Sequence, residues 1–179
     1  MRESLTMRKY TTSETIIANV PYVVMVLLGA VTLAYTGGWS AWRFAGVVGY
    51  LAYGIVGAVW IMVFVCPYCQ YYASTGCPCG YGMISARIVT KGDRDCFVEK
   101  FRRHIFAIVP LWIIPVVCGG IALWRSFSWP LVGLVLAFVG EAWVVLPIVS
   151  KKHGCAECPQ KEQCPWMARG AKDAQHRPA

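Results

Sequence analysis

The sequence predicts an all-α integral membrane protein: a four-transmembrane-helix bundle with a cysteine-rich loop and tail on its cytoplasmic side. Of its residues, 57% are apolar and only 15% are charged. The apolar residues form four runs of about twenty, each long enough to cross about 30 Å of hydrocarbon as a helix. These runs cover residues 16–35, 44–65, 105–123 and 130–149. Eight of the nine cysteines lie between or after the runs, and the ninth lies inside the third.

The distribution of basic residues predicts the orientation. All but two of the 17 Lys and Arg residues lie before the first run, between the second and third, or after the fourth. Only Arg43 and Arg125 occupy the two short connections. Because basic segments stay in the cytoplasm, we expect a multi-pass protein of the cytoplasmic (inner) membrane with both termini cytoplasmic (N-in/C-in). The net charge of +8 then reflects topology, so we expect the lipid bilayer and no nucleic acid as a partner.

The chain divides into segments in this order. Residues 1–15 form a short cytoplasmic N-terminal segment. Residues 16–65 and 105–149 form two transmembrane hairpins, because each short connection forces its two helices to run antiparallel. The second run carries small residues at spacings of three to five, which predicts a face that another helix approaches closely. These residues are Gly46, Gly49, Gly54 and Gly57.

The cytoplasmic loop, residues 66–104, begins where Cys66 meets Pro67. The residue before a proline is pushed out of helical geometry, so the second span ends there. Around Cys77 and Cys79 the chain is too rich in Gly and Pro for a regular element. The loop is therefore suited to wrapping its backbone around a bound group.

Two further elements are expected in this loop. Residues 83–90 form either a short helix or a strand. Asp93 or Asp95 caps a helix that begins near Cys96 and continues into the third span. After the fourth span, residues 150–167 form a cysteine-rich cytoplasmic tail, and residues 168–179 are expected to be disordered.

Cysteines on the cytoplasmic side predict a metal site, because that compartment keeps thiols reduced and disfavours structural disulfides. Eight thiolates match two iron–sulfur clusters of four irons and four sulfides (4Fe–4S), with four cysteine ligands each. Four of the cysteines are followed directly by proline, a step that is frequent in ferredoxins, although no full ferredoxin run is present. The candidate ligands are Cys66, Cys69, Cys77, Cys79, Cys96, Cys155, Cys158 and Cys164.

Other interpretations of the cysteines stay open. Zinc takes four thiolates from the same kind of C-x2-C pairs, and heavy-metal handling would use them as well. The segment from Cys66 to Cys69 also reads like a glutaredoxin-type dithiol, in which the first thiol attacks and the second resolves. Six further cysteines would then have no role. Cys118 lies about 20 Å along the third span from its cytoplasmic end, so it is expected to be a small packing residue.

Glu141 is the only ionisable side chain within the four apolar runs. A buried carboxylate costs several kcal/mol unless it is protonated or paired, so such residues are often functional. Helical rise places Glu141 at nearly the same depth as four large aromatic residues. This layer predicts a pocket for a quinone-like ring, with Glu141 handling its proton; the alternative is a protonated Glu141 within ordinary packing. The aromatic residues are Tyr22, Trp60, Trp112 and Trp143.

Together these features favour an electron-transfer protein. A soluble cytoplasmic redox protein would exchange electrons with clusters held by the loop and tail, and a quinone-like membrane carrier would complete the transfer. No nucleophile and base pair is visible, so any catalysis would be that of an oxidoreductase subunit. A zinc-binding or metal-handling membrane protein and a membrane dithiol oxidoreductase are the competing hypotheses.

Overall fold

The computed structural model describes residues 9–38, 40–155, 158 and 164, with the backbone alone for residues 153–155. The regular elements of this described part are all helices or short helical turns, with no strand. Four helices are long and apolar enough to cross a membrane, which confirms the predicted all-helical, multi-pass architecture. The spans are Thr12–Tyr35, Ala41–Tyr68, Arg94–Arg125 and Trp129–Lys152.

The chain divides into two compact units. The transmembrane unit contains Asn19–Ile61 and Ile105–Val149. The cysteine unit combines the two ends of the chain with the long loop; its three segments are Met1–Ala18, Met62–His104 and Ser150–Ala179. The second and third of these segments hold every cysteine except Cys118.

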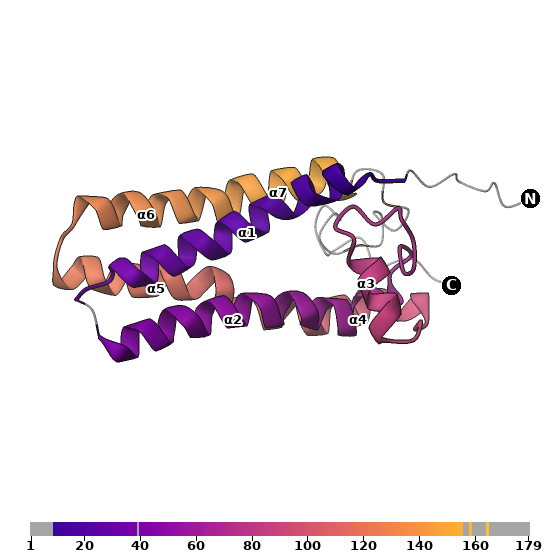
Figure 1. Ribbon diagram of the computed structural model, residues 1–179, viewed down its shortest axis with the longest axis horizontal. Coiled ribbons are helices and arrows are strands. Elements are labelled where there is room, and N and C mark those ends of the chain that lie inside the picture. Colours follow the sequence, from indigo (N-terminus) through magenta and orange to yellow (C-terminus); the bar gives the residue numbers. More distant parts are fainter. Residues whose placement is uncertain (1–8, 39, 156–157, 159–163, 165–179) are drawn as a thin grey trace, which may run out of the picture. The chain divides into compact units, whose positions relative to one another are not determined.

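Two helical hairpins build the transmembrane unit. The first joins α1 (Thr12–Tyr35) to α2 (Ala41–Phe64), and the second joins α5 (Pro110–Arg125) to α6 (Trp129–Gly140). The end of α1 and the start of α2 lie at the same end of this unit as the end of α5 and the start of α6 (Figure 1). The unit is therefore the up-and-down arrangement that short connections favour.

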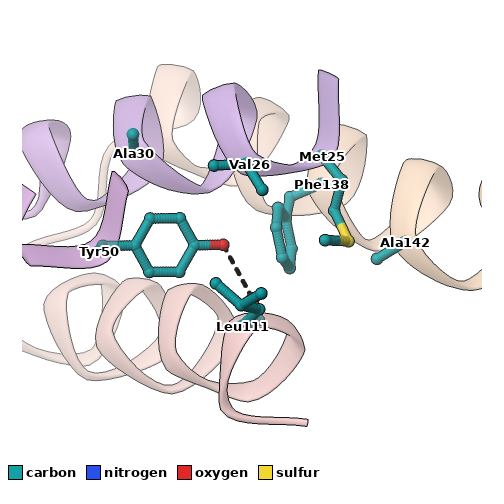
Figure 2. Packing of buried hydrophobic residues seen from close by; sticks show 7 residues of the cluster. All are labelled: Met25, Val26, Ala30, Tyr50, Leu111, Phe138 and Ala142. Atoms are coloured by element: carbon teal, nitrogen blue, oxygen red, sulfur yellow. Dashed lines mark hydrogen bonds between the residues drawn. The ribbon is translucent and has the colours of Figure 1, made fainter. Parts of the chain in front are cut away.

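A single cluster of buried side chains holds these helices together (Figure 2). Met25, Leu111 and Phe138 are fully buried and come from three different helices. Most other large apolar side chains of the unit lie on its outside, as expected for helices surrounded by lipid. The cluster consists of Met25, Val26, Ala30, Tyr50, Leu111, Phe138 and Ala142.

Proline shapes the third span. From α4 (Phe97–Ile105) this span passes through the 3₁₀ turn η3 (Phe106–Ile108) and continues as α5. Pro110 has no N–H to donate, which breaks the α-helical ladder before α5. The Val109 N–H instead donates to the Phe106 carbonyl oxygen at 3.2 Å, a 3₁₀ hydrogen bond that closes the turn.

The fourth span changes its hydrogen-bond register at Glu141. After α6, residues Glu141–Val145 form the π-helix η4, followed by α7 (Leu146–Val149) and a second π-helix, η5 (Ser150–Cys155). The Leu146 N–H donates to the Glu141 carbonyl oxygen, five residues before it. Such π segments are rare and often occur at functional sites.

The glycine face of α2 corrects one expectation. A Cβ at Gly54 would lie 3.0 Å from Val26, and one at Gly57 would lie 3.2 Å from Ile108, so helices do approach closely there. At Gly46 and Gly49, however, a Cβ would meet nothing within 4 Å. Within the described part of the chain, the prediction of a close contact is wrong for this pair, because both glycines face open space.

The cysteine unit contains the remaining short elements. Where the sequence left helix and strand open, the chain forms the helix α3 (Tyr81–Ile88). The Asp93 carboxylate accepts a hydrogen bond from the Asp95 N–H at 3.1 Å and caps the 3₁₀ turn η2 (Arg94–Cys96), from which α4 follows directly. The expected cap and helix start are thereby confirmed. The second span ends in the 3₁₀ turn η1 (Cys66–Tyr68).

Candidate metal centre in the cysteine unit

Cys66 and Cys69 lie on one tight turn. The Cys69 N–H donates to the Cys66 carbonyl oxygen at 3.1 Å, and the Tyr72 N–H donates to that of Cys69 at 3.1 Å. The turn also directs the backbone N–H of Tyr71 at the Cys69 sulfur, which accepts its hydrogen bond. A donor placed in this way stabilises a thiolate.

Cys77 lies on a second turn, which leads into α3. The Gly80 N–H donates to the Cys77 carbonyl oxygen at 3.1 Å, and Gly80 takes a left-handed conformation, with φ of 73°, to begin the helix. The Gly82 N–H then donates to the Cys77 sulfur at 3.5 Å. A Cβ at Gly82 would lie 2.3 Å from the Tyr71 carbonyl oxygen, so this close approach requires glycine.

Thiols of the loop and the tail lie near one another. Cys66 lies within range of the charge that Cys77, Cys69 or Cys79 would carry as a thiolate. Cys69 lies within the same range of Cys77 and of two tail residues, Cys158 and Cys164. The structure therefore brings six of the candidate cysteines into one region, from segments about ninety residues apart in sequence.

Burial is the main influence on Cys69. It raises the pKa of this thiol from 9.0 to about 12; the Tyr71 N–H acts in the opposite direction, and the neighbouring Cys77, Cys158 and Cys164 raise the pKa further. At neutral pH the metal-free site therefore holds a protonated thiol at Cys69. Binding of a metal there would displace a proton.

Three cysteines remain outside this group of six. Cys96 ends η2, which packs against η1. The Gly92 N–H donates to the Pro67 carbonyl oxygen at 3.1 Å and ties the two turns together. The side chain of Cys155 lies outside the described residues. Cys118 belongs to the transmembrane unit, as its position in the third span predicts.

None of the eight cysteines whose side chains are described takes part in a disulfide. Among the described residues, no three His, Cys, Asp or Glu side chains form a group that could hold a metal ion as they stand. The metal role of the cysteines therefore stays a prediction.

One buried side chain that the sequence did not single out fits a sulfur-rich ligand. The Ser85 hydroxyl is fully buried and has no hydrogen-bond partner in the described part of the chain. Ser85 and Gly82 are the buried residues of α3, which packs against η1. A buried hydroxyl without a partner costs about 1–3 kcal/mol, and a ligand sulfur within reach would accept its hydrogen bond. No sequence signal separates this serine from an ordinary polar residue.

Hydrogen bonds outside the thiols hold the two turns in place. The Tyr72 hydroxyl donates to the Val89 carbonyl oxygen at 2.6 Å and connects the first turn with the end of α3. The Tyr10 N–H donates to the Thr75 carbonyl oxygen at 3.1 Å and fastens the loop to the N-terminal segment. Lys100 places its ammonium 5.5 Å from the centre of the Tyr68 ring, a cation–π contact beside η1.

The five residues of the expected quinone pocket have different surroundings. Tyr22 and Trp112 both pack against the buried cluster of the transmembrane unit. The Tyr22 hydroxyl donates to the Gly54 carbonyl oxygen at 2.7 Å. Trp60 and Trp143 are 37% and 50% exposed. Glu141 is partly buried at the start of η4. A pocket formed by these residues stays a prediction.

The transmembrane unit does contain a cavity of about 670 Å³ lined by other residues. It lies between the end of α1, the first half of α2 and part of α5, and none of the five predicted pocket residues lines it. Cys118 does line it, together with Arg43, Tyr50 and Tyr53. The sequence contained one hint, the isolated Arg43 in a short connection.

No protein-family model, curated protein or solved structure matches the chain.

Proposed function

We propose that this chain is a membrane-anchored iron–sulfur protein that passes electrons between a soluble cytoplasmic redox protein and a quinone-like membrane carrier. The observation that carries the proposal is that Cys77 in the loop and Cys158 and Cys164 in the tail all lie near enough to Cys69 to raise its pKa. Thiols gathered from distant segments in a reducing compartment favour a metal centre over disulfide chemistry.

The backbone around these thiols supports a centre built on sulfur. The N–H groups of Tyr71 and Gly82 donate to the sulfurs of Cys69 and Cys77. Ser85 offers a further buried donor. Iron–sulfur clusters, when bound, supply reversible one-electron transfer, and hydrogen bonds to sulfur raise their reduction potential. The proposed ligands are the eight candidate cysteines, whereas these donors would adjust the potential.

The exposed charge of the cysteine unit supports a protein partner. Its loop presents basic side chains to solvent, and complementary charge steers redox partners into contact. We therefore propose a soluble redox protein with an acidic docking face as the electron donor. The exposed basic residues are Arg87, Lys91, Arg94, Arg102 and Arg103.

For the membrane carrier, reduction of one quinone to a quinol takes two electrons and two protons. The electrons would arrive singly from the reduced cytoplasmic partner. We assign proton delivery to Glu141, whose carboxyl would donate a proton and take up another from water. Its place at the start of a π segment supports a functional role, and Tyr22 and Trp112 would border the ring.

The first test is metal and sulfide analysis of protein purified without oxygen, together with an absorption spectrum. We expect about eight irons, about eight acid-labile sulfides and a broad band near 400 nm, as for two 4Fe–4S clusters. Zinc without sulfide, in colourless protein, would overturn the electron-transfer proposal and favour the zinc-binding alternative. Protein with neither metal nor sulfide, but with activity lost in Cys66→Ser and Cys69→Ser alone, would favour the dithiol oxidoreductase.

A further inference from the structure

The cavity of the transmembrane unit has a polar end and an apolar interior. Thr36, just after α1, lies at the polar end with Ser40 and Arg43. Apolar residues, among them Val47 and Ile114, make the rest of the lining predominantly apolar. The volume of about 670 Å³ falls within the range of about 300–1,000 Å³ that is typical of small-molecule sites.

Two glycines keep this cavity open. Gly46 and Gly49 lie on α2 and line the cavity, and a Cβ added at either position would meet nothing within 4 Å. Two other lining residues of α2, Tyr50 and Tyr53, make hydrogen bonds to the third span. The Tyr50 hydroxyl donates to the Leu111 carbonyl oxygen at 2.8 Å, and the Tyr53 hydroxyl donates to that of Ala107. These hydrogen bonds fix two of the side chains that border the cavity.

Arg43 brings a positive charge that the unit does not neutralise. One of its N–H groups donates to the Gly38 carbonyl oxygen, which leaves other donors of its five for a ligand. The only acid within Asn19–Ile61 and Ile105–Val149 is Glu141, and Glu141 does not line the cavity. The part of the chain that the structure describes contains no ion pair of Arg43 with a carboxylate. An anion bound beside Arg43 would balance this charge.

We propose that this cavity binds an anionic phospholipid, with its phosphate at Arg43 and an acyl chain along Val47 and Ile114. The ligand comes from the bilayer, because the cavity lies in the membrane-spanning unit and combines one cationic end with an apolar interior. Trp42, next to Arg43 and 89% exposed, is a residue type that concentrates at the headgroup level of membranes. This proposal does not depend on the iron–sulfur centre, since none of the eight candidate ligands lines the cavity.

The test uses the full chain, purified in detergent, stripped of lipid and titrated with phosphatidylglycerol or phosphatidylcholine. Native mass spectrometry counts bound lipid, and the rate at which N-ethylmaleimide alkylates Cys118, followed by peptide mass, reports whether the cavity is filled. We expect phosphatidylglycerol to bind and to slow the alkylation of Cys118. Phosphatidylcholine should bind at least about fivefold more weakly, and inorganic phosphate alone should not slow the alkylation.

Two pairs of variants separate the site from the rest of the surface. Arg43→Gln should weaken phosphatidylglycerol binding at least about fivefold, the ratio that corresponds to about 1 kcal/mol for one basic side chain at an anionic lipid. Its control, Arg125→Gln, changes the cation of the other short connection. Gly49→Leu fills the cavity and should abolish the protection of Cys118. Its control is Gly133→Leu, because Gly133 also has nothing within 4 Å but lies outside the cavity.

Three outcomes would overturn the proposal. Equal binding of the two lipids would show that Arg43 does not select an anionic headgroup. Equal losses in each variant and its control would place the lipid elsewhere on the surface. Protection of Cys118 by inorganic phosphate alone would make the free ion, rather than a phospholipid, the ligand of the cavity.

Discussion

The hydroxyl of Tyr50 donates a 2.8 Å hydrogen bond to the backbone carbonyl oxygen of Leu111 (Figure 2). In an α-helix this oxygen would accept from the residue four positions later, which here is Pro115 and has no N–H. A side chain of α2 therefore supplies the donor that α5 lacks. The contact joins two spans inside the buried cluster and allows a proline in the middle of a membrane helix.

Tyr50→Phe should destabilise the transmembrane unit by about 1–2 kcal/mol, because the Leu111 carbonyl oxygen would be left buried without this donor. The measurement is the unfolding midpoint of the purified protein in mixed detergent micelles containing increasing denaturing detergent. Tyr35→Phe is the matched control, since Tyr35 is exposed at the end of α1. Equal midpoints for the two variants would show that the hydrogen bond contributes nothing.

Gly29→Ala should destabilise the same unit through a steric clash. The added Cβ would lie 2.3 Å from the Tyr50 hydroxyl oxygen, so the ring would have to move and the hydrogen bond to Leu111 would be lost. We expect a loss of about 1–3 kcal/mol by the same unfolding assay. Gly120→Ala meets nothing within 4 Å and should be neutral or stabilising, because alanine favours the helix. If Gly29→Ala were as stable as Gly120→Ala, the close packing of α1 on Tyr50 would be wrong.

The tail cysteines should matter as much as the loop cysteines for holding iron. Cys158→Ser or Cys164→Ser should lower the iron and sulfide content about as strongly as Cys69→Ser, because these thiols gather in one region. Cys118→Ser should leave the content unchanged, since Cys118 belongs to the transmembrane unit. The check is iron and sulfide per protein after anaerobic purification. Full iron in both tail variants would contradict a centre shared between loop and tail.

Ser85→Ala should make the reduction potential of the bound centre more negative without loss of iron. The buried hydroxyl would donate to a ligand sulfur, and removal of such a hydrogen bond disfavours the more negatively charged reduced state. Anaerobic titration with a redox dye, followed by absorption, gives the potential. Thr90→Ala is the control, because Thr90 is exposed just beyond α3. An unchanged potential in protein that retains its iron would assign Ser85 to packing, whereas iron-free wild-type protein would instead overturn the proposed function.

The stability of the metal-free protein should fall at alkaline pH. Burial raises the pKa of Cys69 from 9.0 to about 12, so the fold favours the neutral thiol. This contribution is fully present below about pH 9 and is lost as the pH rises through about 12. Unfolding midpoints measured at pH values from about 8 to 11 should fall more steeply for the wild type than for Cys69→Ser. Cys118→Ser should follow the wild type; identical slopes in all three proteins would contradict a buried thiol at Cys69.

Local patterns in the sequence predicted part of this molecule well. The four spans follow from apolar runs of membrane length, and the cap at Asp93 follows from a carboxylate just before a helix start. Both depend on residues that are neighbours in the chain, so no knowledge of packing is needed. The grouping of α2 glycines was only half correct for the opposite reason. Gly54 and Gly57 meet other helices whereas Gly46 and Gly49 face open space, and this depends on where the helices approach one another.

For the candidate sites, too, the sequence showed some features and the structure added others. Their chemistry is visible in the chain. The number and spacing of the cysteines identify a set of soft ligands, and a single acid within apolar runs indicates a candidate functional residue. The sequence did not show the proximity of Cys69 to Cys158 and Cys164, the buried hydroxyl of Ser85 or the cavity beside Arg43. Each depends on segments far apart in sequence.

By itself, the sequence determined the four membrane helices, their order and the number of thiols, because the length of an apolar run and the residue types are properties of the chain. Only the tertiary structure decided which thiols meet, which hydroxyl is buried and which glycines border a cavity. The physical reason is that burial and contact depend on the packing of helices against one another. The bond between Tyr50 and Leu111 illustrates this, since its partners are 61 residues apart.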